Sequence, residues 1–200
     1  MSTSSIALPG NVTDWQLPSR GRVGMWCLIG AESAIFTIFV VAYLFYIGKS
    51  TTGPQPRDVL HAPIFYSVCL LSSSVTIHLA VRRIAANEMA AFGRWWLATI
   101  LLGGTFLFGT AREWIHLIND EGLTISTNLF GTTYYSLVGL HALHVTIGLL
   151  ALTIVAVFYF SAKLRCEYAE RLEILSMYWH FVDAVWVIVF TLVYVIGVSQ

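Results

Sequence analysis

The chain has 200 residues, of which 57% are hydrophobic and 11% are charged, and its formal net charge at pH 7 is zero. A soluble domain carries about 25% charged residues, so this composition indicates an integral membrane protein. The balanced charge argues against nucleic-acid binding, which requires a concentrated basic surface. The three cysteines show no metal-ligand spacing, so we expect neither a disulfide framework nor a zinc site.

Five apolar segments are each long enough to cross about 30 Å of hydrocarbon as a helix. They cover residues 23–47, 63–84, 95–118, 132–161 and 174–198. Residues 1–22 are mostly polar and are predicted to form a cytoplasmic leader. We therefore expect an all-α bundle of five transmembrane helices, with residues 23–199 forming one transmembrane domain.

Each of these segments carries a few polar side chains. Glu32 is the only formal charge of the first segment, and the second is rich in hydroxyl groups over residues 72–76, which favours close packing against another helix. The remaining ionisable groups that we single out are, in chain order, Arg112, Glu113 and His116 in the third segment, His141 and His144 in the fourth, and His180 and Asp183 in the fifth.

The basic residues predict the orientation of the bundle. Positive charge is retained on the cytoplasmic side of a membrane. Eight of the eleven Lys and Arg residues fall on the N-terminal side of the predicted bundle, namely Arg20, Arg22, Arg82, Arg83, Arg94, Lys163, Arg165 and Arg171. We therefore predict that the N-terminus is inside and, with five spans, that the C-terminus is outside. The third-segment cluster then lies on the outer side.

Several ionisable groups are predicted to lie near the middle of the membrane. They are Glu32, His141, His144, His180 and Asp183. Residues three apart on a helix share a face, so each pair on one helix should present its polar atoms to one neighbouring helix. Ionisable groups at this depth are costly, which indicates either a function or a structural hydrogen bond.

The spacing of these groups leaves several interpretations open. The side chains could hydrogen-bond one another and fix the helices. His144 with His180 could ligate a haem, and His141 with His144 and a carboxylate could hold a metal ion. Glu32 could belong to a proton-linked site, because burial favours the neutral form of a carboxyl group.

Two motifs in the last two segments resemble those of a known family. Residues 131–148, with the core Gly-Leu-His-Ala-Leu-His-Val over 139–145, resemble the signature of subunit III of the haem-copper cytochrome oxidases. Residues 178–183, Tyr-Trp-His-Phe-Val-Asp, with Glu173 before them, are similar to that family's last-helix motif. Looser matches, in the same order as in the family, lie around Glu32, 71–76 and 106–114.

The resemblance is to the five-helix bacterial form, and it implies a role. The chain would be the non-catalytic subunit III of a proton-pumping haem-copper terminal oxidase, a cytochrome c oxidase of aerobic electron transport in the bacterial inner membrane. The complex would be the enzyme, with haem and copper in catalytic subunit I and in subunit II. This chain would bind membrane phospholipid, support proton uptake and stabilise the catalytic subunit. A larger respiratory supercomplex is a further candidate partner.

The resemblance also sorts the candidate residues. No residue of this chain is expected to be catalytic or to bind a metal ion. The expected interior polar network comprises Glu32, His141, His144, Glu173, His180 and Asp183, and the expected outer-side cluster comprises Arg112, Glu113 and His116. Two alternatives stay open at this point: a subunit-III-like component associated with nitric oxide reductase, and a stand-alone haem-binding membrane cytochrome.

Overall fold

The computed structural model describes residues 19–49, 53–54, 56–60 and 62–199, and within them the chain is helical with no strand. Five helices are long and apolar enough to cross a membrane. They are α1 (Arg20–Tyr46), α3 (Ile64–Ala85), α4 (Met89–Asn119), α5 (Leu129–Phe160) and a continuous fifth helix, Cys166–Ile196. The predicted all-α, five-helix membrane architecture is therefore confirmed. Most of the predicted leader, residues 1–18, lies outside the described residues.

The fifth transmembrane helix is built from several kinds of helix. It starts as the 3₁₀ turn η1 (Cys166–Tyr168), continues as α6 (Ala169–Phe190), and passes into the π-helical segment η2 (Thr191–Ile196). The short helix α7 (Gly197–Ser199) follows η2, and another short helix, α2 (Pro56–Val59), precedes α3. A π-helical segment widens the helix locally, and such segments are often found at functional sites.

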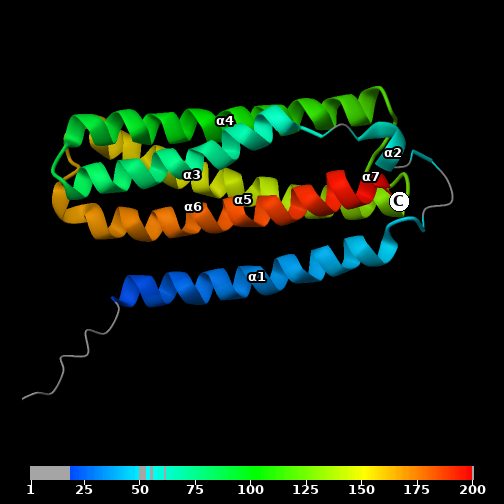
Figure 1. Cartoon of the computed structure of the whole chain (residues 1–200), viewed down its shortest axis with the longest axis horizontal. Helices are drawn as coiled ribbons and strands as arrows, with labels where there is room; N and C mark the ends of the chain where they lie inside the picture. The colour runs from blue at the N-terminus through cyan, green and yellow to red at the C-terminus, as the bar shows by residue number, and fades with distance from the viewer. Residues whose placement is uncertain (1–18, 50–52, 55, 61, 200) are drawn as a thin grey trace, which may run out of the picture.

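Four of the transmembrane helices form a bundle, and α1 packs on its side. Helix α3 packs along α4 and α6, and α5 packs against α4 and α6. Helix α1 contacts only α5 and α6 extensively, and Figure 1 shows it lying apart from α4, at the margin of the molecule. Only Phe36 and Tyr43 of α1 are buried. Most of the α1 surface therefore faces whatever surrounds the bundle.

Two tryptophan side chains of α6 attach this helix to α3 by hydrogen bonds. The indole N–H of Trp179 donates to the Ser73 hydroxyl at 2.8 Å, and that of Trp186 donates to the Ser67 hydroxyl at 3.1 Å. All four residues are buried. In hydrocarbon no water is present to satisfy an indole N–H, so the small hydroxyl residues of α3 serve as acceptors where α6 packs closely.

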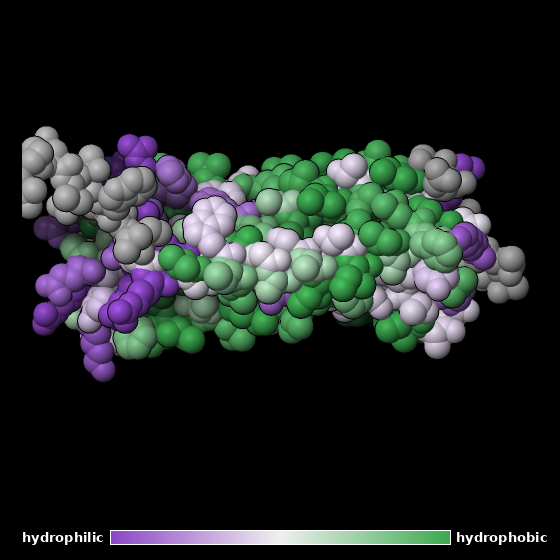
Figure 2. All heavy atoms as spheres, turned by 90° about the horizontal axis from the view of Figure 1, so that it is seen from below, coloured by the Kyte–Doolittle hydropathy of each residue, from purple (hydrophilic) through white to green (hydrophobic). Residues whose placement is uncertain are grey.

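The surface follows the expected membrane pattern. Figure 2 shows hydrophobic residues over the middle of the visible face and hydrophilic residues at the two ends, most densely at the end where α1 begins. That end carries the ion pairs between Arg22 and Glu173 and between Arg83 and Glu88. The predicted placement of this end in the cytoplasm stays a prediction, which rests on its basic residues.

Two adjacent glycines of α4 provide a test of this packing. A Cβ atom added at Gly103 would lie 2.9 Å from the ring of Trp179, whereas one added at Gly104 would meet nothing within 4 Å. We expect Gly103→Ala to destabilise the chain by about 1–3 kcal/mol, the usual range for an overpacked core. Gly104→Ala should leave stability unchanged or raise it. Thermal unfolding of both variants in detergent measures the difference, and equal melting temperatures would contradict the packing of Trp179 described above.

Candidate functional site

The first polar contact in the membrane interior joins α1 to α5. The Nε2 atom of His144 lies 3.0 Å from the Oε2 atom of Glu32. The His144 side chain is 8% exposed and that of Glu32 is 23% exposed. Phe36, one turn after Glu32, packs against the imidazole with ring centroids 4.9 Å apart. The pair is therefore screened on one side by an aromatic ring.

The hydrogen bonds of His144 determine how protons are shared with Glu32. Its Nδ1 atom lies 2.7 Å from the backbone carbonyl of Leu140, and a carbonyl can only accept, so Nδ1 carries a proton. Two states are then consistent with the contact to Glu32. Either a neutral imidazole accepts from a protonated carboxyl, or an imidazolium donates to a carboxylate. In both states the pair holds one proton between the carboxyl group and Nε2, and it is neutral overall.

The second contact joins α6 to α3. The Ser74 hydroxyl donates to the Oδ2 atom of Asp183, and its oxygen lies 3.0 Å from Nδ1 of His180. Because the hydroxyl hydrogen is directed at the carboxyl group, the Ser74 oxygen is free to accept from His180. His180 and Asp183 thus reach the same residue of one neighbouring helix, which confirms the prediction that they share a face.

Asp183 remains incompletely satisfied in this arrangement. The residue is only 3% exposed, and its Oδ1 atom has no hydrogen-bond partner among the described residues. A buried polar atom without a partner costs free energy, so this side chain is a point where a further donor would stabilise the chain.

His141 occupies a different environment from His144. Its imidazole is fully buried and stacks on Trp186 with ring centroids 4.9 Å apart, and Phe106 of α4 packs edge-on against both rings. Neither ring nitrogen has a hydrogen-bond partner in the described part of the chain. The prediction that His141 and His144 address one common neighbour is therefore wrong: His144 faces α1, whereas His141 lies between α4 and α6.

The geometry also bears on the haem and metal interpretations. His144 is directed at α1 and His180 at α3, so the two imidazoles are not aimed at a common ligand. Among the described residues, no group of three or more His, Cys, Asp and Glu side chains is placed to hold a metal ion.

Glu173 lies apart from the other predicted members of the interior network. Its carboxylate accepts a hydrogen bond of 2.7 Å from the guanidinium of Arg22, and both side chains are substantially exposed. The pair joins the beginnings of α1 and α6. The structure thus brings Glu32 together with His144, and His180 together with Asp183, while Glu173 fastens α1 at the end of the bundle.

The outer-side cluster is divided among several contacts. The Oε1 atom of Glu113 accepts from the hydroxyl of Tyr194 at 2.7 Å and from that of Tyr134 at 3.3 Å. His116 lies 2.5 Å from Asp120 on the surface. Arg112 lines an open pocket of about 340 Å³ together with its two cluster partners. The three residues therefore adjoin one pocket, while the hydrogen bonds given above lead from Glu113 to Tyr194 and Tyr134 and from His116 to Asp120.

Three contributors to these contacts were not singled out from the sequence. Ser74 lies in the hydroxyl-rich run, for which the sequence predicts close packing but not which hydroxyl group contacts His180 and Asp183. Tyr134 and Tyr194 bring α5 and the π-helical segment η2 to Glu113. Aromatic residues near the membrane boundary are common, so a tyrosine there gives no specific signal.

Comparisons with known proteins agree on one family. The family model described as cytochrome c oxidase subunit III matches residues 22–198. The cytochrome c oxidase subunit 3 of Alkalihalophilus pseudofirmus is 33% identical over 98% of this chain and 97% of the relative. That of Synechocystis is 36% identical over 90% of this chain and 77% of the relative. The quinol oxidase subunit 3 of Bacillus subtilis is 29% identical, covering 88% and 87%.

The proton shared by Glu32 and His144 makes a labelling experiment informative. A hydrophobic carbodiimide reacts with a protonated carboxyl group in an apolar setting, so we expect Glu32 to be the labelled residue inside the membrane. The label should appear on its peptide by mass spectrometry, and Glu32→Gln should abolish it. Labelling confined to exposed carboxyl groups such as Asp120 and Glu121 would mean that Glu32 is ionised, and would favour the imidazolium form of the pair.

Proposed function

The chain belongs to the cytochrome c oxidase subunit III family, and we propose that it acts in its oxidase as a non-catalytic subunit that supports proton uptake and stabilises the catalytic subunit. As a member of this family it is a subunit of a haem-copper oxidase, and it is a multi-pass membrane protein. Association with other oxidase subunits follows from that membership. We propose that these are the haem-bearing subunit I and the copper-bearing subunit II.

The contact between Glu32 and His144 is the observation that carries this proposal. The two groups share one proton at the junction of α1 and α5, within the membrane-spanning part of the bundle. Within a carboxyl–imidazole pair a proton can move from one group to the other while the pair stays neutral, and the pair becomes negative only while a released proton has not been replaced. Such a group suits a subunit that supports proton delivery to a neighbouring catalytic chain.

An apolar groove between α1 and α6 supports the proposed binding of phospholipid. Its volume is about 410 Å³, and Phe36, Val40, Phe181 and Val185 are among its lining residues. This lining suits an acyl chain. The groove lies along the weakly packed helix, so a lipid there would fill space between α1 and the bundle.

The names of the relatives support an oxidase over the nitric oxide reductase alternative. The relatives cited above are called subunits of cytochrome c oxidase or of quinol oxidase. We propose cytochrome c as the electron donor of the complex, because the family model and two of those three relatives are named after it. We propose the bacterial plasma membrane as its location, because the cited relatives come from bacteria and five helices of this chain can cross a membrane.

Co-purification tests the assembly part of the proposal. An affinity-tagged chain expressed in its native host should retain a haem-bearing subunit with a Soret band, and that band should be absent from the chain purified alone. Asp183→Ala removes the acceptor of Ser74 and should destabilise the α3–α6 contact by about 1–3 kcal/mol, reducing haem recovered per tagged chain. Asp120→Ala, at an exposed site, is the control.

Two results would contradict that expectation. A Soret band in the isolated chain, lost on replacing His144 or His180, would establish a stand-alone cytochrome instead. Equal haem recovery with Asp183→Ala and Asp120→Ala would show that the buried contact does not contribute to assembly.

Replacement of Glu32 by glutamine tests the proton-uptake part. Glutamine can still donate a hydrogen bond to Nε2 of His144, so α1 should remain docked and haem recovery should be unchanged. An amide cannot release a proton at physiological pH, so we expect slower proton uptake and a severalfold shorter active lifetime of the complex during turnover. Proton uptake and oxygen consumption of the purified complex measure both. Wild-type values for both quantities would exclude Glu32 from proton delivery.

A further inference from the structure

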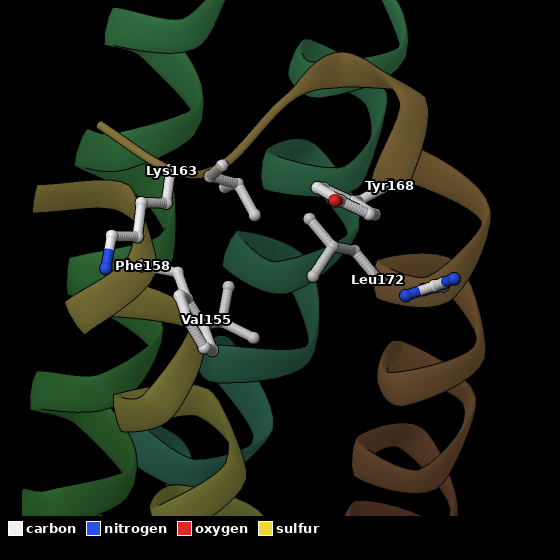
Figure 3. Close-up of a pocket in the computed structure, with 7 residues that line it drawn as sticks. Val155, Phe158, Lys163, Tyr168 and Leu172 are labelled. Carbon is white, nitrogen blue, oxygen red and sulfur yellow. The ribbon is translucent and has the colours of Figure 1, made fainter. Parts of the chain in front are cut away.

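A pocket of about 350 Å³ lies between the end of α5 and the start of α6, at the end of the molecule that carries most of the basic residues. Pockets for small ligands usually span about 300–1,000 Å³, so this one is large enough for part of a ligand. Figure 3 shows Lys163 beside Phe158 on one side of the space, with Tyr168 and Leu172 across from them.

Two cations line this pocket without a carboxylate partner. Lys163 and Arg171 are both exposed, and neither lies within ion-pair distance of an acidic side chain among the described residues. Two other cations at the same end are neutralised: Arg22 pairs with Glu173 and Arg83 with Glu88. Two cations without an ion-pair partner among the described residues therefore lie in the wall of one pocket.

An aromatic side chain fixes one of these cations. The guanidinium carbon of Arg171 lies 5.2 Å from the ring centroid of Tyr168, within the range of a cation–π contact. The acidic residues of the same link, Glu167 and Glu170, are exposed and do not line the pocket. The charge inside the pocket is thus positive even though the link as a whole is mixed.

The rest of the wall is apolar and continues onto the lipid-facing surface of α5. Val155, Phe158 and Leu172 form this wall. Phe158 is also 48% exposed, and nearby Val157 and Phe160 are 58% and 68% exposed. A ligand with an anionic head in the pocket could therefore extend a hydrocarbon tail directly along the helix.

We propose that this pocket binds one anionic phospholipid, with Lys163 and Arg171 holding its phosphate and the wall around Phe158 receiving an acyl chain. The pocket lies at the end of two transmembrane helices, where lipid head groups are found. Basic pockets between transmembrane helices on the cytoplasmic side bind anionic head groups in this way. A soluble anion would use the two cations but would gain nothing from the apolar wall.

This site extends the lipid binding given under the proposed function but can be tested separately from it. The groove between α1 and α6 has no cation among its lining residues, whereas this pocket selects for charge. Loss of binding here would leave haem co-purification as the independent measure of oxidase assembly.

The experiment is a lipid titration of the full-length purified chain in detergent, followed by native mass spectrometry. Phosphatidylglycerol is the anionic probe and phosphatidylcholine is the neutral one. The variant Lys163→Gln/Arg171→Gln should weaken binding of one phosphatidylglycerol by at least about tenfold, since each basic residue near an anionic head group contributes several-fold to affinity. The control Arg82→Gln/Arg165→Gln removes the same charge from exposed positions at the same end, outside the pocket, and should keep wild-type affinity.

A second variant separates a lipid from a free phosphate. Val155→Phe keeps both cations and fills the apolar part of the cavity, so it should weaken phosphatidylglycerol binding, and millimolar inorganic phosphate should not displace the lipid from the wild-type chain. Three outcomes would overturn the proposal: equal affinity for phosphatidylcholine, equal loss in the two double variants, or displacement by phosphate together with an unaffected Val155→Phe.

Discussion

The hydrogen bond between Glu32 and His144 secures α1 to the bundle within the membrane. Helix α1 buries only two side chains, so apolar packing alone holds it weakly. Hydrocarbon supplies no water to an unpaired carboxyl or imidazole, and separating the two groups would strand both. The ion pair between Arg22 and Glu173 adds a second attachment at the end of the bundle, where water screens it. The interior contact is therefore the one that α1 cannot lose at low cost.

The sequence was sufficient to predict the five helices and the shared face of His180 and Asp183. Long apolar runs can only be helices in hydrocarbon, because each backbone group must be satisfied within its own segment. His180 and Asp183 are three residues apart and both reach Ser74, as the helical period requires. That prediction needed no knowledge of which helices are neighbours, since both groups belong to one face of one helix.

The same helical period gave a wrong prediction for His141 and His144, which do not face one common neighbour. The reason is the position of α5 in the bundle. Residues three apart are rotated by about 60° around a helix, which is enough to reach different neighbours where three helices surround the fourth. Helix α5 contacts α1, α4 and α6, and its two histidines face different ones. Partners such as Glu32 for His144, or Tyr194 for Glu113, depend on this arrangement, which no local pattern of residues specifies.

The shared proton couples the docking of α1 to the charge of the pair. While α1 is docked, the pair is neutral overall, whether Glu32 or His144 carries the proton at their junction. Removal of that proton leaves a carboxylate next to a neutral imidazole whose Nδ1 hydrogen is committed to Leu140, so Nε2 then offers a lone pair to a negative charge. This repulsion would weaken the contact between Glu32 and His144, which holds a helix whose surface is otherwise mostly exposed. Proton release at this junction would therefore also weaken the attachment of α1. Because α1 forms one wall of the groove between α1 and α6, the width of that groove would change with it.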